Sequence, residues 1–291
     1  MQPTLQNVEQ MALFAGRILM AHYGKQHQVQ HKGRIDIVTE VDKQSEEFLV
    51  KTIQDKFPGH SILSEEIGQL QGVPEHCWYV DPLDGTNNYE RGIPLFGVLI
   101  AYAHQGQLQL GVIYEPVHKL LYTAERSKGA YKNGERIRVS DTHTLINAVL
   151  STGFPLNPQP QEDNNFNNFV HMSKKVRSVR RFGSTAINLS YTASGLLDGY
   201  WEVGSKPWDI AAGTLLIKEA GGVVTDLRGE EDYFKPPYAI VAGNEVLQPL
   251  LLKELRLSRT AQGFDQQQYN QELESNHKPG AAKNRTGRKT K

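Results

Sequence analysis

Hydrophobic residues near the start of the chain recur every three or four positions, which is the spacing of one face of an α-helix. The first series ends before Gly24 and consists of Leu5, Val8, Ala12, Ala15 and Leu19. A second series precedes Pro58-Gly59 and consists of Val41, Phe48, Leu49, Ile53 and Phe57. Thr39, with Asp42 three residues later, imitates a capping box at the start of this second series. The pattern predicts two amphipathic helices joined by a polar loop.

Short apolar runs bounded by turn residues follow these helices, and such runs predict β-strands. The predicted strands cover residues 61–64, 77–80, 96–103, 107–114, 120–124 and 137–140. Asn133-Gly134, a strong hairpin turn signal, stands just before the last of them. We expect a large antiparallel sheet flanked by the two helices.

From Ala148 onward the chain alternates between predicted strands and predicted helices. The strands cover residues 148–152, 176–182, 199–203, 223–226 and 239–242, and the helices cover residues 166–175, 184–194, 208–220 and 246–257. Alternation of this kind is typical of α/β layers. The sequence therefore predicts an α+β half over residues 1–145 and an α/β half over residues 146–258, with the boundary near residues 142–147.

The remaining segment, residues 259–291, is rich in Gln, Asn, Lys and Gly from Ala261 onward. Its low hydrophobicity predicts a disordered tail. A basic tail can touch nucleic acid or anionic surfaces, but for so short a segment we favour a solubilising appendage.

Composition narrows the class of protein. The 291 residues carry a formal net charge of zero, so no field of one sign favours nucleic acid or a membrane surface. The single cysteine, Cys77, excludes an internal disulfide and lies in an apolar run, where a buried hydrophobic role is favoured over a catalytic thiol. No apolar stretch reaches membrane-spanning length, and no secretory signal begins the chain. We expect a soluble, cytoplasmic protein.

Two carboxylates follow the apolar run 77–80 at the point where the predicted strand ends. Asp81 and Asp84 stand on either side of Pro82, and Gly85-Thr86 then opens a predicted short helix. Carboxylate oxygens suit a hard divalent cation, and a helix N-terminus suits a phosphate group. A turn in which the two aspartates only cap backbone groups is the alternative, and this motif alone leaves both readings open.

Two further acidic residues stand at predicted element ends, Glu65 after strand 61–64 and Asp209 at the start of helix 208–220. No His or Cys cluster accompanies the four carboxylates and no EF-hand spacing is present, so zinc is disfavoured and Mg²⁺ or Mn²⁺ is favoured. In a two-metal site the ions share a bridging carboxylate. Asp81 is the best placed to bridge, because it comes first on the rigid strand end.

Three motifs together resemble those of the inositol monophosphatase family. The first is Asp-Pro-Leu-Asp-Gly-Thr at 81–86 with Tyr89 three residues later, the second is Trp-Asp-Ile-Ala-Ala-Gly at 208–213 running on to Glu-Ala-Gly-Gly at 219–222, and the third is Ser-Glu-Glu at 64–66. The resemblance extends over about residues 5–257. It implies a layered α-β-α-β-α sandwich of two sheets, with the metal site between the two halves, and a homodimer.

The resemblance also implies roles for individual residues. One Mg²⁺ would bind Glu65, Asp81 and the backbone carbonyl of Leu83, a second would bind Asp81, Asp84 and Asp209, and Asp42 would lie near a weakly held third unless it is only a cap. Glu65 and Thr86 would hold the attacking water. The substrate would contact the Gly85 and Thr86 amides, the Gly183-Ser184-Thr185 stretch, Glu202 and Asp209. For residues 183–185, a plain strand–helix junction with a serine cap is the alternative.

The function so implied is a Mg²⁺-dependent, lithium-sensitive phosphomonoesterase acting on a small polyol phosphate, with myo-inositol 1-phosphate as the leading substrate. Fructose-1,6-bisphosphatase, 3′(2′),5′-bisphosphate nucleotidase and histidinol-phosphatase activities are alternatives within the class. A catalytically silent regulatory relative is the alternative outside it. Such a relative is expected to have lost a metal carboxylate, whereas Glu65, Asp81, Asp84 and Asp209 are all present.

Overall fold

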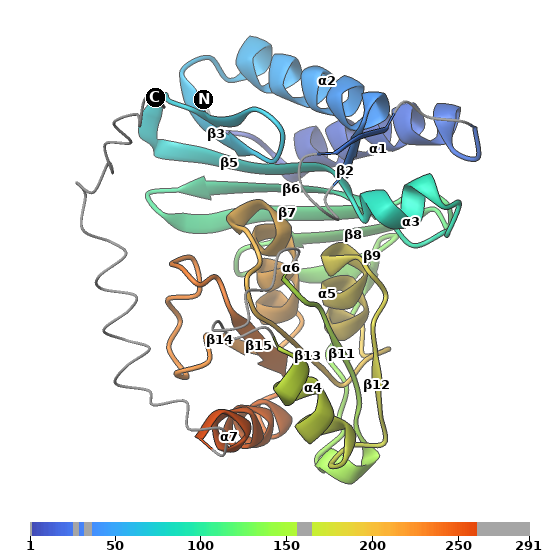
Figure 1. The fold of residues 1–291 in the computed structure, drawn as a ribbon. Helices are drawn as coiled ribbons and strands as arrows, with labels where there is room; N and C mark the ends of the chain where they lie inside the picture. Colours follow the sequence, from blue (N-terminus) through green and yellow to red (C-terminus); the bar gives the residue numbers. More distant parts are fainter. Residues whose placement is uncertain (1, 26–28, 32–36, 156–164, 261–291) are drawn as a thin grey trace, which may run out of the picture.

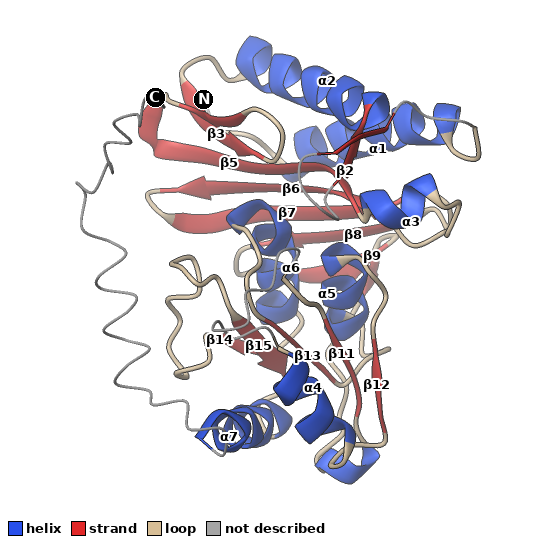
Figure 2. Cartoon of the chain, in the orientation of Figure 1, coloured by secondary structure: helices blue, strands red, loops and turns tan. Residues whose placement is uncertain are grey.

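The computed structural model describes residues 2–25, 29–31, 37–155 and 165–260. Its helices and sheets stack in alternating layers, as Figures 1 and 2 show. The helices are α1 (Leu5–His22), α2 (Glu40–Lys56), α3 (Thr86–Glu90), α4 (Phe166–Ser173), α5 (Thr185–Ala193), α6 (Pro207–Glu219) and α7 (Leu247–Thr260), with one 3-10 turn at Leu145–Asn147. None of these helices combines the length and the hydrophobicity that a membrane span requires.

Eight strands form the first sheet, in the order β10-β9-β8-β7-β6-β5-β3-β4. They are β3 (His60–Ser64), β4 (Gly68–Leu70), β5 (Val73–Asp84), β6 (Gly97–His104), β7 (Gln107–Glu115), β8 (Leu120–Glu125), β9 (Gly129–Lys132) and β10 (Glu135–Arg136). All neighbours pair antiparallel except β3 and β5, which are parallel. The sequence predicts an antiparallel sheet, and the parallel pair β3 and β5 makes the sheet mixed instead.

Five strands form the second sheet, in the order β12-β11-β13-β15-β14. They are β11 (Val149–Thr152), β12 (Ser178–Arg180), β13 (Gly199–Glu202), β14 (Val223–Thr225) and β15 (Ile240–Gly243). β11 pairs parallel with β12 and β13, whereas β15 pairs antiparallel with β13 and β14. A separate two-stranded ribbon, β1 (Val29–His31) with β2 (Ile37–Thr39), was not predicted.

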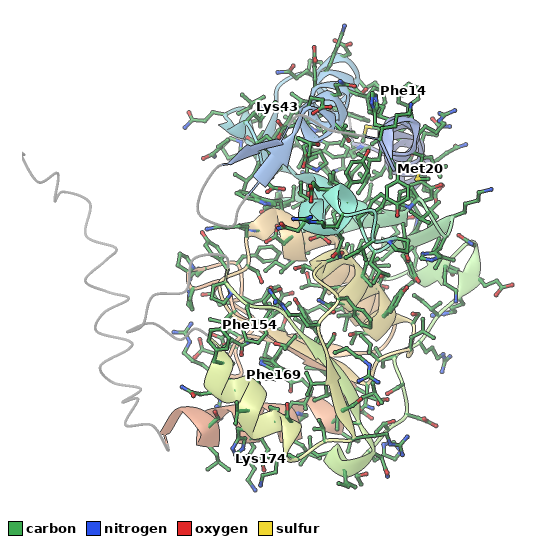
Figure 3. All side chains as sticks on the ribbon, turned by 45° about the vertical axis from the view of Figure 1, so that its right-hand side comes forward. Phe14, Met20, Lys43, Phe154, Phe169 and Lys174 are labelled. Carbon is green, nitrogen blue, oxygen red and sulfur yellow. The ribbon has the colours of Figure 1, made fainter. Side chains whose placement is uncertain are left out.

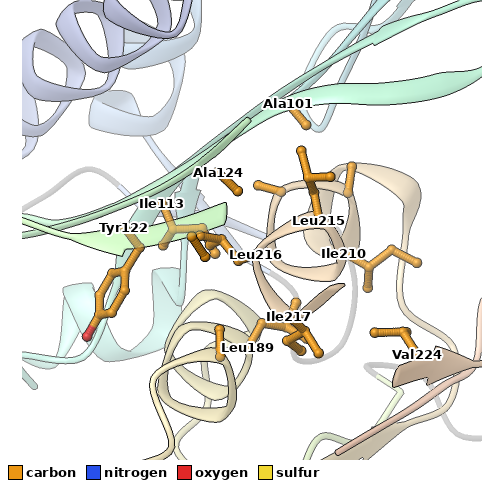
Figure 4. Close-up of a cluster of buried hydrophobic side chains, with 14 of the residues drawn as sticks. Ala101, Ile113, Tyr122, Ala124, Leu189, Ile210, Leu215, Leu216, Ile217 and Val224 are labelled. Carbon is orange, nitrogen blue, oxygen red and sulfur yellow. The ribbon is translucent and has the colours of Figure 1, made fainter. Parts of the chain in front are cut away.

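Three hydrophobic clusters join the layers. One packs α1 and α2 on the first sheet, and a second fills the space around α5 and α6 between the two sheets. Figure 4 shows part of this middle cluster, in which Leu216 of α6 lies near Ile113 and Leu215 lies near Ala101 of the first sheet. The third cluster packs α4 and α7 on the second sheet, and at α4 the rings of Phe154 and Phe169 lie 5.8 Å apart (Figure 3). The predicted α-β-α-β-α layering is confirmed.

Most element boundaries agree with the periodicity, and the capping box of Thr39 and Asp42 is present at the start of α2. The strand predicted at 137–140 is wrong. The chain leaves the sheet after β10, and the Val139 N–H donates to the Ala220 carbonyl at the end of α6 instead, over 3.2 Å. The predicted tail from residue 261 onward lies outside the described residues.

Candidate functional site

The parallel pairing of β3 with β5 brings two acidic strand ends together. Ser64 lies opposite Val80, and the Glu65 N–H donates to the Val80 carbonyl over 3.2 Å. Glu65 and Asp81 are the next residues on the two strands, so their side chains leave the sheet at the same edge. The two carboxyl groups lie close enough for Glu65 to raise the pKa of Asp81. Asp81 is buried, whereas Glu65 is half-buried.

The turn after Asp81 is stabilised by hydrogen bonds between its own residues. Asp81 Oδ1 accepts the Leu83 N–H over 3.0 Å. Gly85 has a φ of 85°, a left-handed conformation that favours glycine, and it caps α3. The Thr86 hydroxyl lies 3.1 Å from the Leu83 carbonyl oxygen and 3.2 Å from Asp42 Oδ1, between two acceptors. Thr86 therefore lies beside the Leu83 carbonyl and Asp42, whereas the family resemblance paired it with Glu65.

Asp84 reaches across to the N-terminus of α5, although the two are about a hundred residues apart in sequence. It accepts the Ser184 hydroxyl and the Ala186 N–H on Oδ2, and the Thr185 N–H on Oδ1 over 3.1 Å. Ser184 also caps α5 by accepting the Ile187 N–H. The serine-cap reading of residues 183–185 is thus confirmed, and the same residues bind Asp84.

Glu202 and Asp209 approach the site from the second half of the chain. Glu202 ends β13 and accepts hydrogen bonds from the hydroxyls of Thr185 and Tyr200. Asp209 stands in the first turn of α6, where its Oδ2 accepts the Lys206 N–H over 2.7 Å. The loop between β13 and α6 therefore places both carboxylates on the side of α5 that holds Asp84.

The carboxyl groups influence one another strongly. Burial raises the pKa of Asp81 well above its ordinary value, and the charges of Glu65, Asp84 and Asp209 raise it further. Burial also raises the pKa of Asp209 far above its usual range, with Glu65, Asp84 and Glu202 adding to the effect. For Asp84, burial raises the pKa, while its bonds to α5 oppose the rise. The carboxyl groups of Glu65, Asp81, Asp84 and Asp209 therefore lie near enough to one another for their charges to interact.

The donor set suits a hard divalent cation, since every candidate ligand is an oxygen and a cation would relieve the repulsion. Asp84 Oδ1 accepts one N–H and so keeps a lone pair for a metal. Among the described residues, however, no three His, Cys, Asp or Glu side chains already form a metal site.

Sequence reasoning missed a residue that supports the site from α2. Glu46 is buried, and its Oε1 accepts the Ser64 hydroxyl and the N–H groups of Glu66 and Ile67. Beside it, the Ser45 hydroxyl donates to the Pro82 carbonyl over 3.1 Å. Asp42, Ser45 and Glu46 recur at three- and four-residue spacing, the signal of a polar stripe on the buried face of a helix.

Three further residues, Cys77, Gly183 and Lys206, are not fully buried. Cys77 is half-buried, and burial raises the pKa of its thiol, which agrees with an unreactive role. Gly183 is exposed, with its φ of 74° turning the chain into the cap at Ser184. Lys206 is also exposed.

Comparison with known proteins gives the same picture over nearly the whole described chain. The model of the inositol monophosphatase family matches residues 1–260. An inositol-1-monophosphatase of Mesorhizobium japonicum is 43% identical over 250 residues, which cover 85% of this chain and 94% of that protein. A protein named Nus factor SuhB, from Pasteurella multocida, is 38% identical and covers 87% of this chain and 96% of its own.

A solved structure is similar as well. The structure of inositol monophosphatase from Anabaena (Nostoc) sp. superposes with a TM-score of 0.79 at 38% identity, over 87% of this chain and 95% of that one. Fold, site geometry and sequence agree, and the chain belongs to the inositol monophosphatase family of phosphatases.

Proposed function

We propose that this phosphatase is Mg²⁺-dependent and hydrolyses the monoester of a small polyol, with myo-inositol 1-phosphate as the leading substrate. The observation that carries the proposal is the gathering of the carboxyl groups of Glu65, Asp81, Asp84 and Asp209 within electrostatic range of one another, with Asp81 and Asp84 buried. Four clustered carboxylates are costly unless a cation binds them. Phosphate esters are the substrates that such cations bind.

Each carboxylate has a place in the proposed metal set. One Mg²⁺ would be held by Glu65, Asp81 and the Leu83 carbonyl, and a second by Asp81, Asp84 and Asp209. A third, weakly held ion near Asp42, and replacement by Mn²⁺, are part of the proposal. When bound, the ions would stabilise negative charge on the phosphoryl group and acidify a water molecule. If lithium takes the second of these sites, the enzyme is lithium-sensitive.

Thr86 is positioned to move a proton. A hydroxyl can take a proton from water only if it passes its own proton on. Thr86 Oγ1 lies 3.2 Å from Asp42 Oδ1, so Asp42 is an acceptor for that proton, and Glu65 beside Asp81 can orient the same water. The Gly85 and Thr86 amides, at the start of α3, would bind phosphate oxygens.

The polyol assignment rests on Glu202, which ends β13 and contacts the residue that binds Asp84. A carboxylate at this place can accept hydrogen bonds from alcohol hydroxyls of the leaving group. Sugar bisphosphates, nucleotide bisphosphates and histidinol phosphate remain the alternatives. Phosphate release from a panel of inositol, sugar, nucleotide, histidinol and aryl phosphates with Mg²⁺ tests the proposal. Faster release from any of the other esters than from inositol phosphate would overturn the assignment.

A second candidate function is that of a regulatory protein without catalysis. It is considered because some relatives are named Nus factor SuhB. The presence of all four carboxylates favours the enzyme. Isothermal titration with Mg²⁺ separates the two, because a silent relative has no need of the ion. Heat of binding in the millimolar range that disappears in Asp81→Asn supports the enzyme, and no binding supports the regulatory role.

The proposal includes a homodimer in the cytoplasm, as the family resemblance and the single cysteine suggest. Light scattering on a size-exclusion column tests the dimer, for which a monomeric mass would be contrary evidence.

A further inference from the structure

Two neighbours hold one oxygen of the Glu202 carboxylate. The Tyr200 hydroxyl donates to Glu202 Oε2, and the Thr185 hydroxyl donates to the same oxygen over 3.1 Å. Tyr200 precedes Glu202 by two positions on β13, so both side chains lie on the same face of the second sheet. With two donors, Oε2 has its lone pairs occupied. Oε1 accepts neither of these two bonds, and with the buried Ser205 hydroxyl close to the carboxylate it is the oxygen that we assign to a ligand.

Gly153 lies against that remaining oxygen. A Cβ built on Gly153 would come within 1.9 Å of Glu202 Oε1, so a side chain there would displace the carboxylate. Gly153 directly follows β11, the strand that pairs with β13. The Glu202 carboxylate is thus held on one side by the Tyr200 and Thr185 hydroxyls. On the other side it has room only because residue 153 is a glycine.

Tyr200 is suited to a permanent donor role. Its side chain is fully buried in the cluster between the two sheets, and its hydroxyl donates to Glu202. Burial raises the pKa of the phenol well above its ordinary value, and the charge of Glu202 adds to that rise. The phenol therefore keeps its proton and always donates to Glu202.

We propose that Tyr200 is a positioning residue for substrate specificity: its phenol and Gly153 fix Glu202 so that Oε1 accepts a hydroxyl of the polyol leaving group. The inference rests on the proposed function, since it assigns a task at the alcohol side of the same site. It predicts that specificity for polyols depends on a residue that touches no substrate.

The test compares two substrates, myo-inositol 1-phosphate and an aryl phosphate that has no alcohol hydroxyls. Tyr200→Phe keeps the buried ring but removes the donor, so KM for inositol phosphate should rise about tenfold or more, the loss expected when a bond to a charged group is removed. The kcat for inositol phosphate and both constants for the aryl phosphate should stay within about twofold. Gly153→Ala should give the same split, because it moves the same carboxylate from the other side.

Tyr122→Phe is the matched control. Tyr122 is fully buried in the same hydrophobic cluster, and its hydroxyl has no hydrogen-bond partner among the described residues. It should change neither KM. If Tyr200→Phe and Tyr122→Phe behave alike, or if Tyr200→Phe impairs both substrates equally, the positioning role is wrong.

Glu202→Gln separates failure of this inference from failure of the proposed function. If Glu202→Gln raises KM for inositol phosphate and Tyr200→Phe does not, Tyr200 has no positioning role and the polyol contact stands. If Glu202→Gln leaves that KM unchanged, the polyol contact itself is wrong and the role of Tyr200 is overturned with it.

Discussion

The Glu66 N–H donates to Glu46 Oε1 over 3.0 Å, so a buried carboxylate on α2 fixes the turn that carries Glu65. The same oxygen also accepts the Ser64 hydroxyl. Support of this kind matters for a proposed metal ligand, because a loosely held carboxylate binds a cation less tightly.

Replacement of Glu46 by Ala should weaken both the fold and Mg²⁺ binding. The change leaves the Ser64 hydroxyl and two backbone N–H groups without their acceptor, which costs about 2 kcal/mol or more in the free energy of unfolding. The Mg²⁺ concentration for half-maximal activity should rise several-fold. Denaturant unfolding and a Mg²⁺ titration of activity measure the two effects. Glu47→Ala, at an exposed position one residue along α2, is the control and should change neither.

Asp81→Asn should reduce kcat by at least about a hundredfold at saturating Mg²⁺, a typical loss when transition-state charge stabilisation is removed. The same variant should melt at a higher temperature than the native protein in a chelator, because it removes a repelled charge from a buried cluster. Calorimetry with and without Mg²⁺ shows the second effect. Near-native activity in Asp81→Asn would mean that the metal set is wrongly assigned.

Lithium should inhibit the enzyme uncompetitively with respect to substrate, if it occupies the proposed second site after the reaction and retains phosphate. Initial rates over a grid of Li⁺ and substrate concentrations test this expectation. A competitive pattern would place lithium elsewhere. Complete insensitivity would indicate a differently shaped second site and would leave the phosphatase assignment intact.

The contribution of His60 to stability should fall as the pH is lowered from about 6.5 to about 4, in opposition to the buried site carboxylates, whose raised pKa values favour the folded state in acid. Burial, together with the charge of His76, lowers the pKa of His60 to about 4. His60 Nδ1 accepts the Trp78 Nε1–H over 3.1 Å, and a protonated ring cannot accept it. Since the unfolded chain has the ordinary histidine pKa of about 6.5, it binds more protons than the folded chain between those values, and acid favours unfolding.

Melting temperatures across this pH range provide the measurement. The melting temperature of His60→Gln should rise relative to that of the native protein as the pH falls, whereas His143→Gln, at an exposed position, should keep the native slope. If the melting temperatures of all three proteins change with pH in the same way, His60 does not contribute to the pH dependence of stability.

Hydrophobic periodicity predicted the helices well because α1 and α2 each bury one continuous face against the first sheet. It failed at residues 137–140, where an apolar alternation serves packing against α6 rather than strand pairing. The parallel pairing of β3 and β5 was not predictable from local pattern either. Pairing direction depends on how the whole chain between the strands is routed, and periodicity carries no such information.

The acidic residues of the site were predictable because each stands where a strand ends or a helix begins. Their supports were not. The bonds from Ser184 and Thr185 to Asp84 join residues about a hundred positions apart, and only the packing of α5 against the first sheet brings them together. Glu46 was missed because a glutamate on a helix is ordinarily a solvated residue.

Thr185 carries one further consequence, since its N–H donates to Asp84 and its hydroxyl to Glu202. Asp84, at the proposed phosphate end of the substrate, and Glu202, at the proposed alcohol end, are therefore both held by Thr185. This shared contact fixes the distance between the two carboxylates. This distance is difficult to increase, because α5, which carries Thr185, is packed closely against α6. A Cβ on Gly213 of α6 would come within 2.4 Å of Leu189 of α5. Substitutions at Asp84 or Glu202 would change the affinity for a substrate of the present length. Binding of a longer substrate would require the whole of α5 to move.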